Sequence, residues 1–357
     1  EIYQCDWSSD VCSSDLKQEQ VPATDEITHV ANGIYRTQLP IDMPGLGHVN
    51  MYVFEDDRGV AVVDPGLPGK ANQKAIHARL RALGVPLKRV HSIVVTHSHP
   101  DHFGGAARLR AATGADIITH QSFRLWFDPT EPDDVDVEIV AQHKRGSGET
   151  PWGGPGYQLP LKRKMYYNAF RVLPQIFKVP QPTVRLAEGE YVSLAGRKWM
   201  AIHTPGHTED HLCLFDAENG VMLCGDHVLP TITPHISGMS KHPDPLAGFF
   251  NSLDKVGAFG KQVGISLPAH GKPFADIATR CDQIKEHHKG RLDKLRTAAA
   301  ELDRPTTVTE FSGHLFSPRA QGTMADSETF AHLEHLRIAG EFSYSVRNGV
   351  REYVRIS

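Results

Sequence analysis

The chain has little cysteine and no long hydrophobic run. Five cysteines occur among 357 residues, and two of them fall in an N-terminal segment of unusual composition. The other three, Cys213, Cys224 and Cys281, are odd in number and lack CxxC spacing, which argues against a disulfide framework. Buried thiols in a reducing compartment are the simplest interpretation, so we predict a cytoplasmic protein. No apolar run approaches the roughly 20 residues that cross a bilayer, which predicts no membrane partner.

An excess of positive charge is also absent. The formal net charge is -4, which gives no general reason to expect nucleic acid as a partner. Hydrophobic residues make up 40% of the chain and charged residues 22%, as in ordinary globular proteins. Histidine is the residue that stands out, with 21 copies, and the positions of these histidines carry most of the functional prediction.

The first twenty residues have neither hydrophobic periodicity nor an initiator methionine. Trp7-Ser8-Ser9-Asp10 and Cys12-Ser13-Ser14-Asp15 nearly repeat each other, and the segment resembles translated sequencing-adaptor read-through. A disordered natural N-terminus is the alternative. A secretory signal would need a basic start and a continuous apolar stretch, and neither is present. We therefore predict that residues 1–20 are non-native or disordered and lie outside the folded domain.

Strands and helices alternate in the following hundred residues. Buried runs at 60–63 and 92–96 predict strands, and residues 69–83 and 106–114 show the periodicity of helices. Strand patterns resume near residue 184 and recur to 267. Alternation of this kind predicts an α/β fold in which helices pack on sheets.

Two segments depart from this pattern. Residues 121–182 are rich in proline and glycine without clear periodicity, which is typical of a functional lid or a disordered insert. Residues 276–302 read as one long charged helix, a second helix follows, and Asn348-Gly349 marks a hairpin. We therefore predict a catalytic domain over 21–275, with a lid at 121–182, and a small winged-helix-like domain over 276–357.

Four potential metal ligands occur within six positions of the segment Thr96-His97-Ser98-His99-Pro100-Asp101-His102. It follows a predicted buried strand and precedes a helix, so it occupies a loop at the carboxyl edge of the sheet, where open α/β sheets bind ligands. A chance polar loop, with Asp101 as the helix cap, is the alternative. Imidazole and carboxylate groups are the usual ligands of zinc and neighbouring divalent metals, which favours a metal site.

Three further residues follow apolar strands in the same way. His207 lies in a TPGHT turn, Asp226 in a GDH sequence and His270 in an AHG sequence, each a few residues beyond a predicted strand. Each alone reads equally well as an ordinary polar turn residue. Because such strand ends gather at one edge of a sheet, we predict that all three join the cluster at 97–102.

These four motifs, HxHxDH at 97–102, TPGHT at 204–208, GDH at 225–227 and AHG at 269–271, resemble those of the metallo-β-lactamase-fold superfamily. Their order is similar to that of its glyoxalase II-like dinuclear branch. The resemblance covers residues 27–272 and implies an αββα sandwich. It also implies two divalent metal ions per chain, with zinc as the first choice and iron or manganese as alternatives.

The resemblance implies a role for each ligand. The first metal would be held by His97, His99 and His207, the second by Asp101, His102 and His270, and Asp226 would bridge them. Asp101 and Asp226 would be the catalytic carboxylates, Asp101 by orienting the metal-bound hydroxide. Asp64, in the family's DPG position, is predicted to hydrogen-bond a ligand histidine, with a simple turn aspartate as the alternative. His227 and His235 are predicted to face the site from behind the ligands, with the alternative that His227, which directly follows a ligand, points away.

Two adjacent metals lower the pKa of a bridging water from about 15.7 towards about 7 and so supply hydroxide. We therefore predict a hydrolase that attacks a carboxylic thioester, ester or lactone. Phosphodiester cleavage, as in a ribonuclease that uses the same metals, is the alternative, and a non-enzymatic winged-helix nucleic-acid-binding protein is a second. Between residues 326 and 357 there are four arginines and five acidic residues. This balance of charge makes a nucleic-acid partner unexpected. The C-terminal module is expected to cover one wall of the cleft or to form a homo-oligomer contact.

The insert predicts the substrate class. Six basic residues and no acids occur between 160 and 185, interleaved with aromatic residues. We predict a lid that presents aromatic surface to an acyl chain and positive charge to an anionic handle, as an acyl-CoA-like ester would need. A solvated basic face over a small local core is the alternative. The predicted lid residues are Lys162, Arg163, Lys164, Tyr166, Tyr167 and Phe170.

Overall fold

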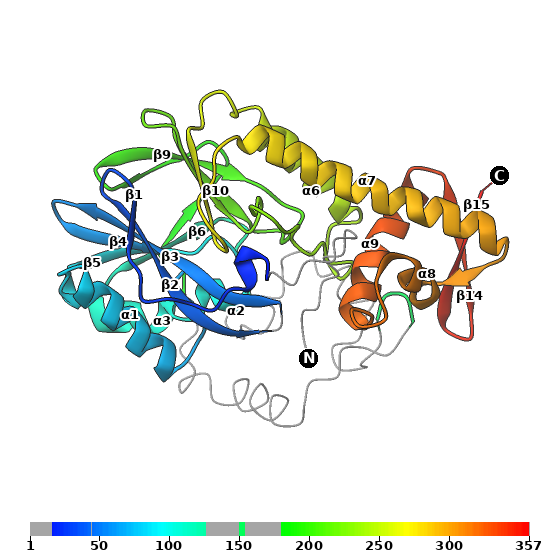
Figure 1. Cartoon of the computed structure of the whole chain (residues 1–357), viewed down its shortest axis with the longest axis horizontal. Helices are drawn as coiled ribbons and strands as arrows, with labels where there is room; N and C mark the ends of the chain where they lie inside the picture. The colour runs from blue at the N-terminus through cyan, green and yellow to red at the C-terminus, as the bar shows by residue number, and fades with distance from the viewer. Residues whose placement is uncertain (1–15, 44, 126–149, 154–179, 357) are drawn as a thin grey trace.

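The computed structural model describes residues 16–43, 45–125, 150–153 and 180–356. Two large β-sheets form its centre, and helices cover their outer faces (Figure 1). The first sheet contains, in spatial order, β1 (Thr28–Ala31), β2 (Ile34–Met43), β3 (Leu46–Asp56), β4 (Gly59–Val63), β5 (Val90–Val94), β6 (Asp116–His120) and β7 (Val184–Leu186). The second contains β12 (Ile265–Pro268), β11 (Val221–Gly225), β10 (Leu212–Asp216), β9 (Arg197–His203) and β8 (Tyr191–Leu194).

The first sheet changes from antiparallel to parallel pairing at β4. Strands β1 to β4 pair antiparallel, whereas β4 to β7 pair in parallel. Parallel neighbours need crossover connections. These are α1 (Lys70–Ala82) with the short 3-10 helix η2 (Leu87–Arg89), and then α2 (Pro100–Phe103) with α3 (Ala106–Thr113). The loops that leave β4 and β5 therefore emerge at the same edge of the sheet.

Three clusters of buried apolar side chains define the layers. In the first, Ile76 of α1 packs on the first sheet. The second fills the space between the two sheets, where the ring centroids of Phe54 and Trp199 are 5.0 Å apart. The third joins the second sheet to α6 (Pro245–Gly257) and α7 (Ile277–Leu302). The order helix, sheet, sheet, helix is that of the predicted αββα sandwich.

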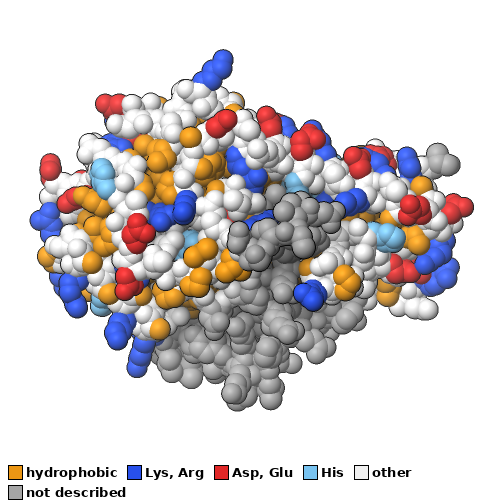
Figure 2. Space-filling model, in the orientation of Figure 1, with side chains coloured by type: hydrophobic (Ala, Val, Ile, Leu, Met, Phe, Trp, Pro, Cys, Tyr) orange, Lys and Arg blue, Asp and Glu red, His pale blue; other side chains and the backbone are white. Residues whose placement is uncertain are grey.

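Beyond α7 the chain forms two helices and a small sheet. These elements are α8 (Val308–Leu315), α9 (Thr323–Ile338), β13 (Thr306–Thr307), β14 (Phe342–Arg347) and β15 (Val350–Arg355). The predicted Asn-Gly hairpin is confirmed, since β14 pairs with β15 and both Asn348 and Gly349 have positive φ. One apolar cluster joins α7, α8 and α9 to α6, so these helices pack against the sandwich. Acidic and basic side chains are interspersed over the face of this part seen in Figure 2.

The N-terminal boundary differs from the prediction. Residues Gln18–Gln20 form a short 3-10 helix, and the Glu19 side chain is fully buried. Its carboxylate accepts hydrogen bonds from the backbone N–H groups of Thr231 and Ile232 and from the Thr231 hydroxyl. The prediction that the first twenty residues lie outside the fold is therefore wrong for residues 18–20, because a buried carboxylate there has partners more than two hundred residues away in the chain.

Most of the predicted lid lies outside the described residues, including Lys162, Arg163, Lys164, Tyr166, Tyr167 and Phe170. Within the insert, residues 150–153 are described and contact the C-terminal part. The Trp152 ring is buried and lies 5.3 Å from that of Phe330, and its carbonyl accepts a 3.0 Å hydrogen bond from the Arg351 N–H. This short piece is therefore anchored on α9 and β15.

The cysteine prediction is confirmed, since Cys213, Cys224 and Cys281 are free and buried. Burial raises the pKa of the Cys213 and Cys281 thiols to about 12, so both are protonated near neutral pH and are poor nucleophiles. Among the helices of the described chain, none has the length and apolar character that a membrane crossing requires.

Candidate metal centre

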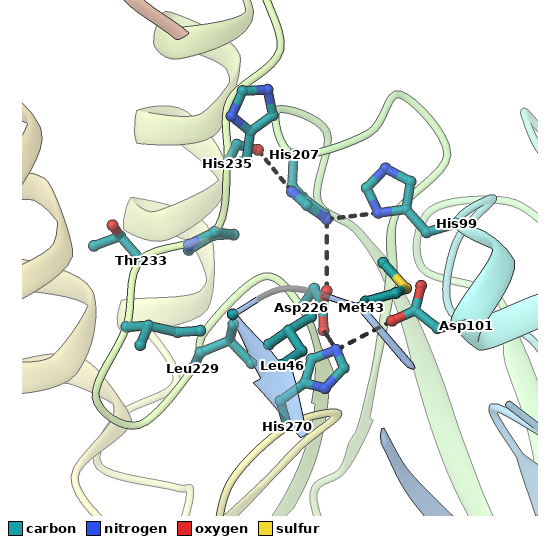
Figure 3. Close-up of a pocket in the computed structure, with 13 residues that line it drawn as sticks. Met43, Leu46, His99, Asp101, His207, Asp226, Leu229, Thr233, His235 and His270 are labelled. Atoms are coloured by element: carbon teal, nitrogen blue, oxygen red, sulfur yellow. Dashed lines mark hydrogen bonds and ion pairs between the residues drawn. The ribbon is translucent and has the colours of Figure 1, made fainter. Parts of the chain in front are cut away.

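The predicted ligands meet where the strands of both sheets end. His97 and His99 follow β5, and Asp101 and His102 lie in α2 directly after them. From the second sheet, the β9–β10 loop contributes His207, the end of β11 contributes Asp226, and the end of β12 contributes His270. Figure 3 shows side chains from these separate segments converging on one pocket.

The ligand atoms form two groups, and within each group all atoms lie within 4.8 Å of one another. One group consists of His97, His99, His207 and Asp226, and the other of Asp101, His102 and His270. Asp226 lies between them: its Oδ2 is 3.6 Å from His207 Nε2 and 3.5 Å from His102 Nε2, and its Oδ1 is 3.3 Å from His270 Nε2. This is the division that the family resemblance implies.

Unpaired polar atoms test whether these residues fit metal ions. His102 Nε2, His270 Nε2 and Asp226 Oδ1 are buried and form no hydrogen bond within the described chain beyond ion-pair contacts such as those of 3.3 and 3.5 Å given above. Leaving such an atom unsatisfied costs about 1–3 kcal/mol, so three of them in one cluster indicate a shared cation as their partner. A set of imidazole and carboxylate donors suits zinc, iron or manganese. The residues therefore fit divalent cations.

In the group of His97, His99, His207 and Asp226, the charges favour the forms that bind metal. Burial lowers the pKa of His97 well below its usual value, and burial together with His207 lowers that of His99 to about 3. Burial alone would raise the pKa of Asp226, but His270 and His102 hold it well below its usual range. Neutral imidazoles and an ionised carboxylate are therefore present at neutral pH, as metal ligation requires.

The second group carries protons that a metal has to displace. Burial acts to lower the pKa of His102, but Asp101 and Asp226 raise it well above its usual value. The pKa of His270 is also raised, because Asp226 and Asp101 outweigh its burial. Metal binding at this group is therefore coupled to proton release and weakens in acid.

The ring nitrogens that face away from the centre are held by oxygen atoms. His207 Nδ1 lies 2.7 Å from the His235 carbonyl, and His270 Nδ1 lies 2.6 Å from the His48 carbonyl. Because each Nδ1–H donates to a carbonyl, Nε2 keeps its lone pair for a metal. His99 differs, since its Nδ1 is the atom that faces the group, 3.0 Å from His97 Nε2.

Asp64 lies where the sequence analysis expects it. Its Oδ2 is 2.9 Å from His102 Nδ1, and its carboxylate accepts hydrogen bonds from the Thr96 N–H and hydroxyl at 2.9 and 2.8 Å. The residue is buried and has a φ of 50°, a left-handed conformation that aspartate and asparagine tolerate better than most residues. Asp64 therefore links the two loops that leave β4 and β5.

Replacing Asp64 by asparagine should weaken metal binding by about 10- to 100-fold, because a neutral amide holds the His102 ring less strongly. Asparagine also tolerates the left-handed backbone, so the fold should survive. Titration of the metal-free variant with zinc measures the affinity. The matched control is Asp216→Asn, which removes a buried carboxylate paired with Arg197 outside the centre. Equal loss of affinity in both variants would show a general effect of destabilisation instead.

Of the two histidines predicted to lie behind the ligands, only one lines the pocket. His235 lines the pocket, and its carbonyl holds His207. His227 does not line it: the buried ring lies 5.2 Å from that of Phe249 on α6. The prediction that His227 lies behind the ligands is corrected, because consecutive residues at a strand end point to opposite sides and Asp226 already faces the centre.

Two groups that hold the ligand residues, the His211 ring and the His48 carbonyl, were not predicted from the sequence. His211 accepts a 3.0 Å hydrogen bond from the Asp226 N–H through Nε2, while its Nδ1 contacts the Thr204 hydroxyl at 2.7 Å. Its position shortly after the TPGHT motif was the available signal. The carbonyl of His48 gives no such signal, because a backbone atom is the same for every residue type.

The pocket above the ligands has a polar floor and an apolar wall. His99, Asp101, His207, Asp226 and His270 form the floor of this cavity of about 50 Å³. Its wall is made by Met43, Leu46, Leu229, Ile232 and Pro234. Within the described part of the chain, no lysine or arginine lines it. The pocket therefore suits a small polar reacting group joined to an apolar one.

Comparison with known proteins agrees with this architecture. The family model of the metallo-beta-lactamase superfamily matches residues 44–297. The chain is 28% identical over 319 residues to an atrochrysone carboxyl ACP thioesterase of Passalora fulva, over 85% of this chain and 75% of that protein. It is 26% identical over 189 residues to a hydroxyacylglutathione hydrolase of Albidiferax ferrireducens, over 52% of this chain and 50% of that protein. A metallo-beta-lactamase family protein of Thermus thermophilus superposes with a TM-score of 0.73 at 28% identity, over 91% of this chain and 99% of that one.

An αββα sandwich with clustered histidine and aspartate side chains at one edge defines a candidate metal-dependent hydrolase. The chain belongs to the metallo-β-lactamase superfamily, a superfamily of hydrolases. Its relatives include a hydroxyacylglutathione hydrolase, which agrees with the glyoxalase II-like resemblance of the motifs.

Proposed function

We propose that the protein hydrolyses a carboxylic thioester, ester or lactone at a two-metal centre, with zinc as the first-choice metal. The observation that carries this proposal is the pocket, in which two groups of metal-binding side chains meet an apolar wall. When bound, two such ions supply hydroxide near neutral pH and polarise the carbonyl that it attacks. Support for a thioester comes from a relative named as a thioesterase.

The carboxylates of the floor have different tasks. Asp226 contacts both groups and would bridge them. Asp101 lines the pocket, and its Oδ2 lies 3.6 Å from His270 Nε2. Burial acts to raise the pKa of Asp101, but His102 and His270 lower it to about 2, so the carboxylate remains a hydrogen-bond acceptor. It would accept a hydrogen bond from the attacking water and thereby orient it.

The apolar wall would hold the acyl part of the substrate. Leu229 and Ile232 belong to a loop whose carbonyls accept hydrogen bonds of 2.7 Å each from Arg280 of α7. We further propose that the chain beyond residue 275 is a winged-helix-like module, and the Arg280 contacts support a role for it in bracing one wall of the cleft. The basic and aromatic insert residues, such as Lys162 and Tyr166, lie outside the described residues, and their contact with an acyl-CoA-like handle remains a prediction.

Hydrolysis of acyl thioesters should exceed hydrolysis of bis-aryl phosphodiesters and RNA by the metal-loaded protein. An RNA substrate needs several phosphate contacts, so its binding would weaken steeply with salt, whereas a thioester needs few. We therefore expect KM for an acyl-CoA to change less than about threefold between roughly 50 and 200 mM salt, because few ionic contacts form. The test is to measure hydrolysis rates for each of these substrates over this range of salt concentration. Efficient, strongly salt-sensitive RNA cleavage without acyl hydrolysis would reverse the assignment in favour of a ribonuclease.

A further inference from the structure

The wall of the pocket is tied to helix α9. The His235 carbonyl accepts from the ligand His207, and the His235 ring turns its Nδ1 to Glu328 of α9, 3.4 Å from Oε2. Three residues further on, the Gly238 N–H donates to both the carbonyl and the hydroxyl oxygen of Ser327 at 3.1 Å. Two neighbouring residues of α9 therefore fix the loop that carries His235.

Glu328 is a buried carboxylate with a counter-ion. Its other oxygen, Oε1, pairs with Arg291 of α7, which is also buried. Burial acts to raise the pKa of Glu328, but Arg291 and His235 hold it well below its usual range. An ionised carboxylate accepts hydrogen bonds only, so Nδ1 of His235 must carry the hydrogen. In the neutral ring, Nε2 then presents a lone pair.

Nε2 of His235 has no partner within the described chain. Three residues that line the pocket contain a buried polar side-chain atom without a hydrogen bond, namely Asp226, His235 and His270. The atoms of Asp226 and His270 belong to the metal-binding groups. His235 belongs to neither group, and its ring stands beside His207 at the rim of the pocket (Figure 3). Metal binding therefore explains the missing hydrogen bonds of Asp226 and His270, but not that of His235 Nε2.

We propose that His235 determines specificity by accepting a hydrogen bond from an N–H or O–H group of the substrate through Nε2, and that Glu328 positions the ring. The inference rests on the proposed function, because it names which acyl substrates the same pocket selects. The substrate donor would then lie at the rim of the pocket, as an amide N–H on the leaving thiol or a hydroxyl on the acyl chain could. The C-terminal helices are then part of the substrate site.

Matched substrates test the recognition. One pair is the hexanoyl thioester of N-acetylcysteamine and that of 2-mercaptoethyl acetate, which differ by an N–H in place of an oxygen. The other is 3-hydroxyhexanoyl and hexanoyl thioesters of one thiol. Wild type should prefer the donor-bearing member of at least one pair by about three- to tenfold in kcat/KM, mainly through KM, as one hydrogen bond allows. His235→Phe should abolish this preference, and His235→Gln, which retains an acceptor oxygen, should keep part of it.

Glu328 is tested against a control on the same helix. Glu328→Gln should reduce the preference more than it reduces the metal content, because its side chain contacts the ring of His235 and no metal ligand directly. The control, Glu334→Gln, removes another α9 carboxylate, which pairs with Arg337 and Arg351. It should leave the preference intact even where thermal unfolding shifts equally. Equal preferences in both variants, or no preference in the wild type, would overturn the inference.

Nitrogen NMR gives a readout that needs no catalysis. With nitrogen-labelled histidine, and the signal of His235 assigned by comparison with His235→Gln, the ring should carry its hydrogen on Nδ1 in the wild type and lose that bias in Glu328→Gln. Hydrogen on Nε2 in the wild type would refute the positioning by Glu328 whatever the reaction. Failure of the metal-loaded protein to cleave any thioester, with the Nδ1–H form present, would instead refute the proposed function and the recognition that depends on it.

Discussion

Replacing Asp226 by alanine should lower kcat/KM by at least about a thousandfold, the scale on which loss of a transition-state electrostatic partner acts. This carboxylate contacts His102, His207 and His270 and is the side chain shared by both groups. Asp226 would hold both ions, so its loss should weaken their binding and remove the Lewis-acid activation of water that they would supply. Elemental analysis should find less than about half of the wild-type metal content, because both sites lose a ligand.

His270→Ala is the matched comparison for this variant. In the wild type, His270 belongs only to the group formed with Asp101 and His102. The variant should therefore lose mainly one metal and keep the other. A wild-type protein that carries no transition metal, and gains no activity on reconstitution, would contradict the metal assignment. Retention of both metals by the Asp226 variant would contradict its bridging position alone.

The metal-binding residues were readable from the sequence because each belongs to a local pattern. An apolar strand followed within a few residues by His97, His207, Asp226 or His270 places the side chain at a sheet edge, whatever the rest of the fold does. The αββα order followed from alternating strand and helix periodicity together with the family resemblance. In these cases the relevant information lies within a few residues of the ligand.

What the sequence did not reveal depends on contacts between distant segments. Glu328 is 93 positions from His235, and neither residue lies in a sequence pattern that predicts contact with the other. The same holds for Glu19. Its segment was excluded from the fold because of its composition, but its hydrogen-bond partner, Thr231, lies far away in the sequence. Whether a carboxylate is solvated or buried against a loop is decided by tertiary packing, which periodicity does not encode.

Acidification from about pH 7 to 4.5 should strongly destabilise the metal-free protein, because buried neutral histidines resist protonation. Burial lowers the pKa of His332 to about 4 and places that of His288 well below the usual value. The native state keeps these rings neutral, while the unfolded chain takes up protons below about pH 6.5. Their stabilising contribution is therefore complete above that pH and is lost as the pH falls towards the native pKa values. Over two pH units the His332 ring alone contributes roughly 3 kcal/mol, a large share of a typical domain stability of about 5–15 kcal/mol, and His288 acts in the same direction.

A single buried histidine should account for a measurable share of this slope. His332 contacts the Glu328 carbonyl through Nδ1 at 2.7 Å and His288 Nδ1 through Nε2 at 3.0 Å, an arrangement that two neutral rings can make. His332→Gln removes the titrating group, so the free energy of unfolding should fall less steeply between about pH 6 and 4.5, by about 1.4 kcal/mol per pH unit. Urea unfolding of the metal-free protein at several pH values measures the slope. His314→Gln replaces an exposed histidine and should leave the slope unchanged. If the two variants share the wild-type slope, buried neutral histidines do not cause the acid sensitivity.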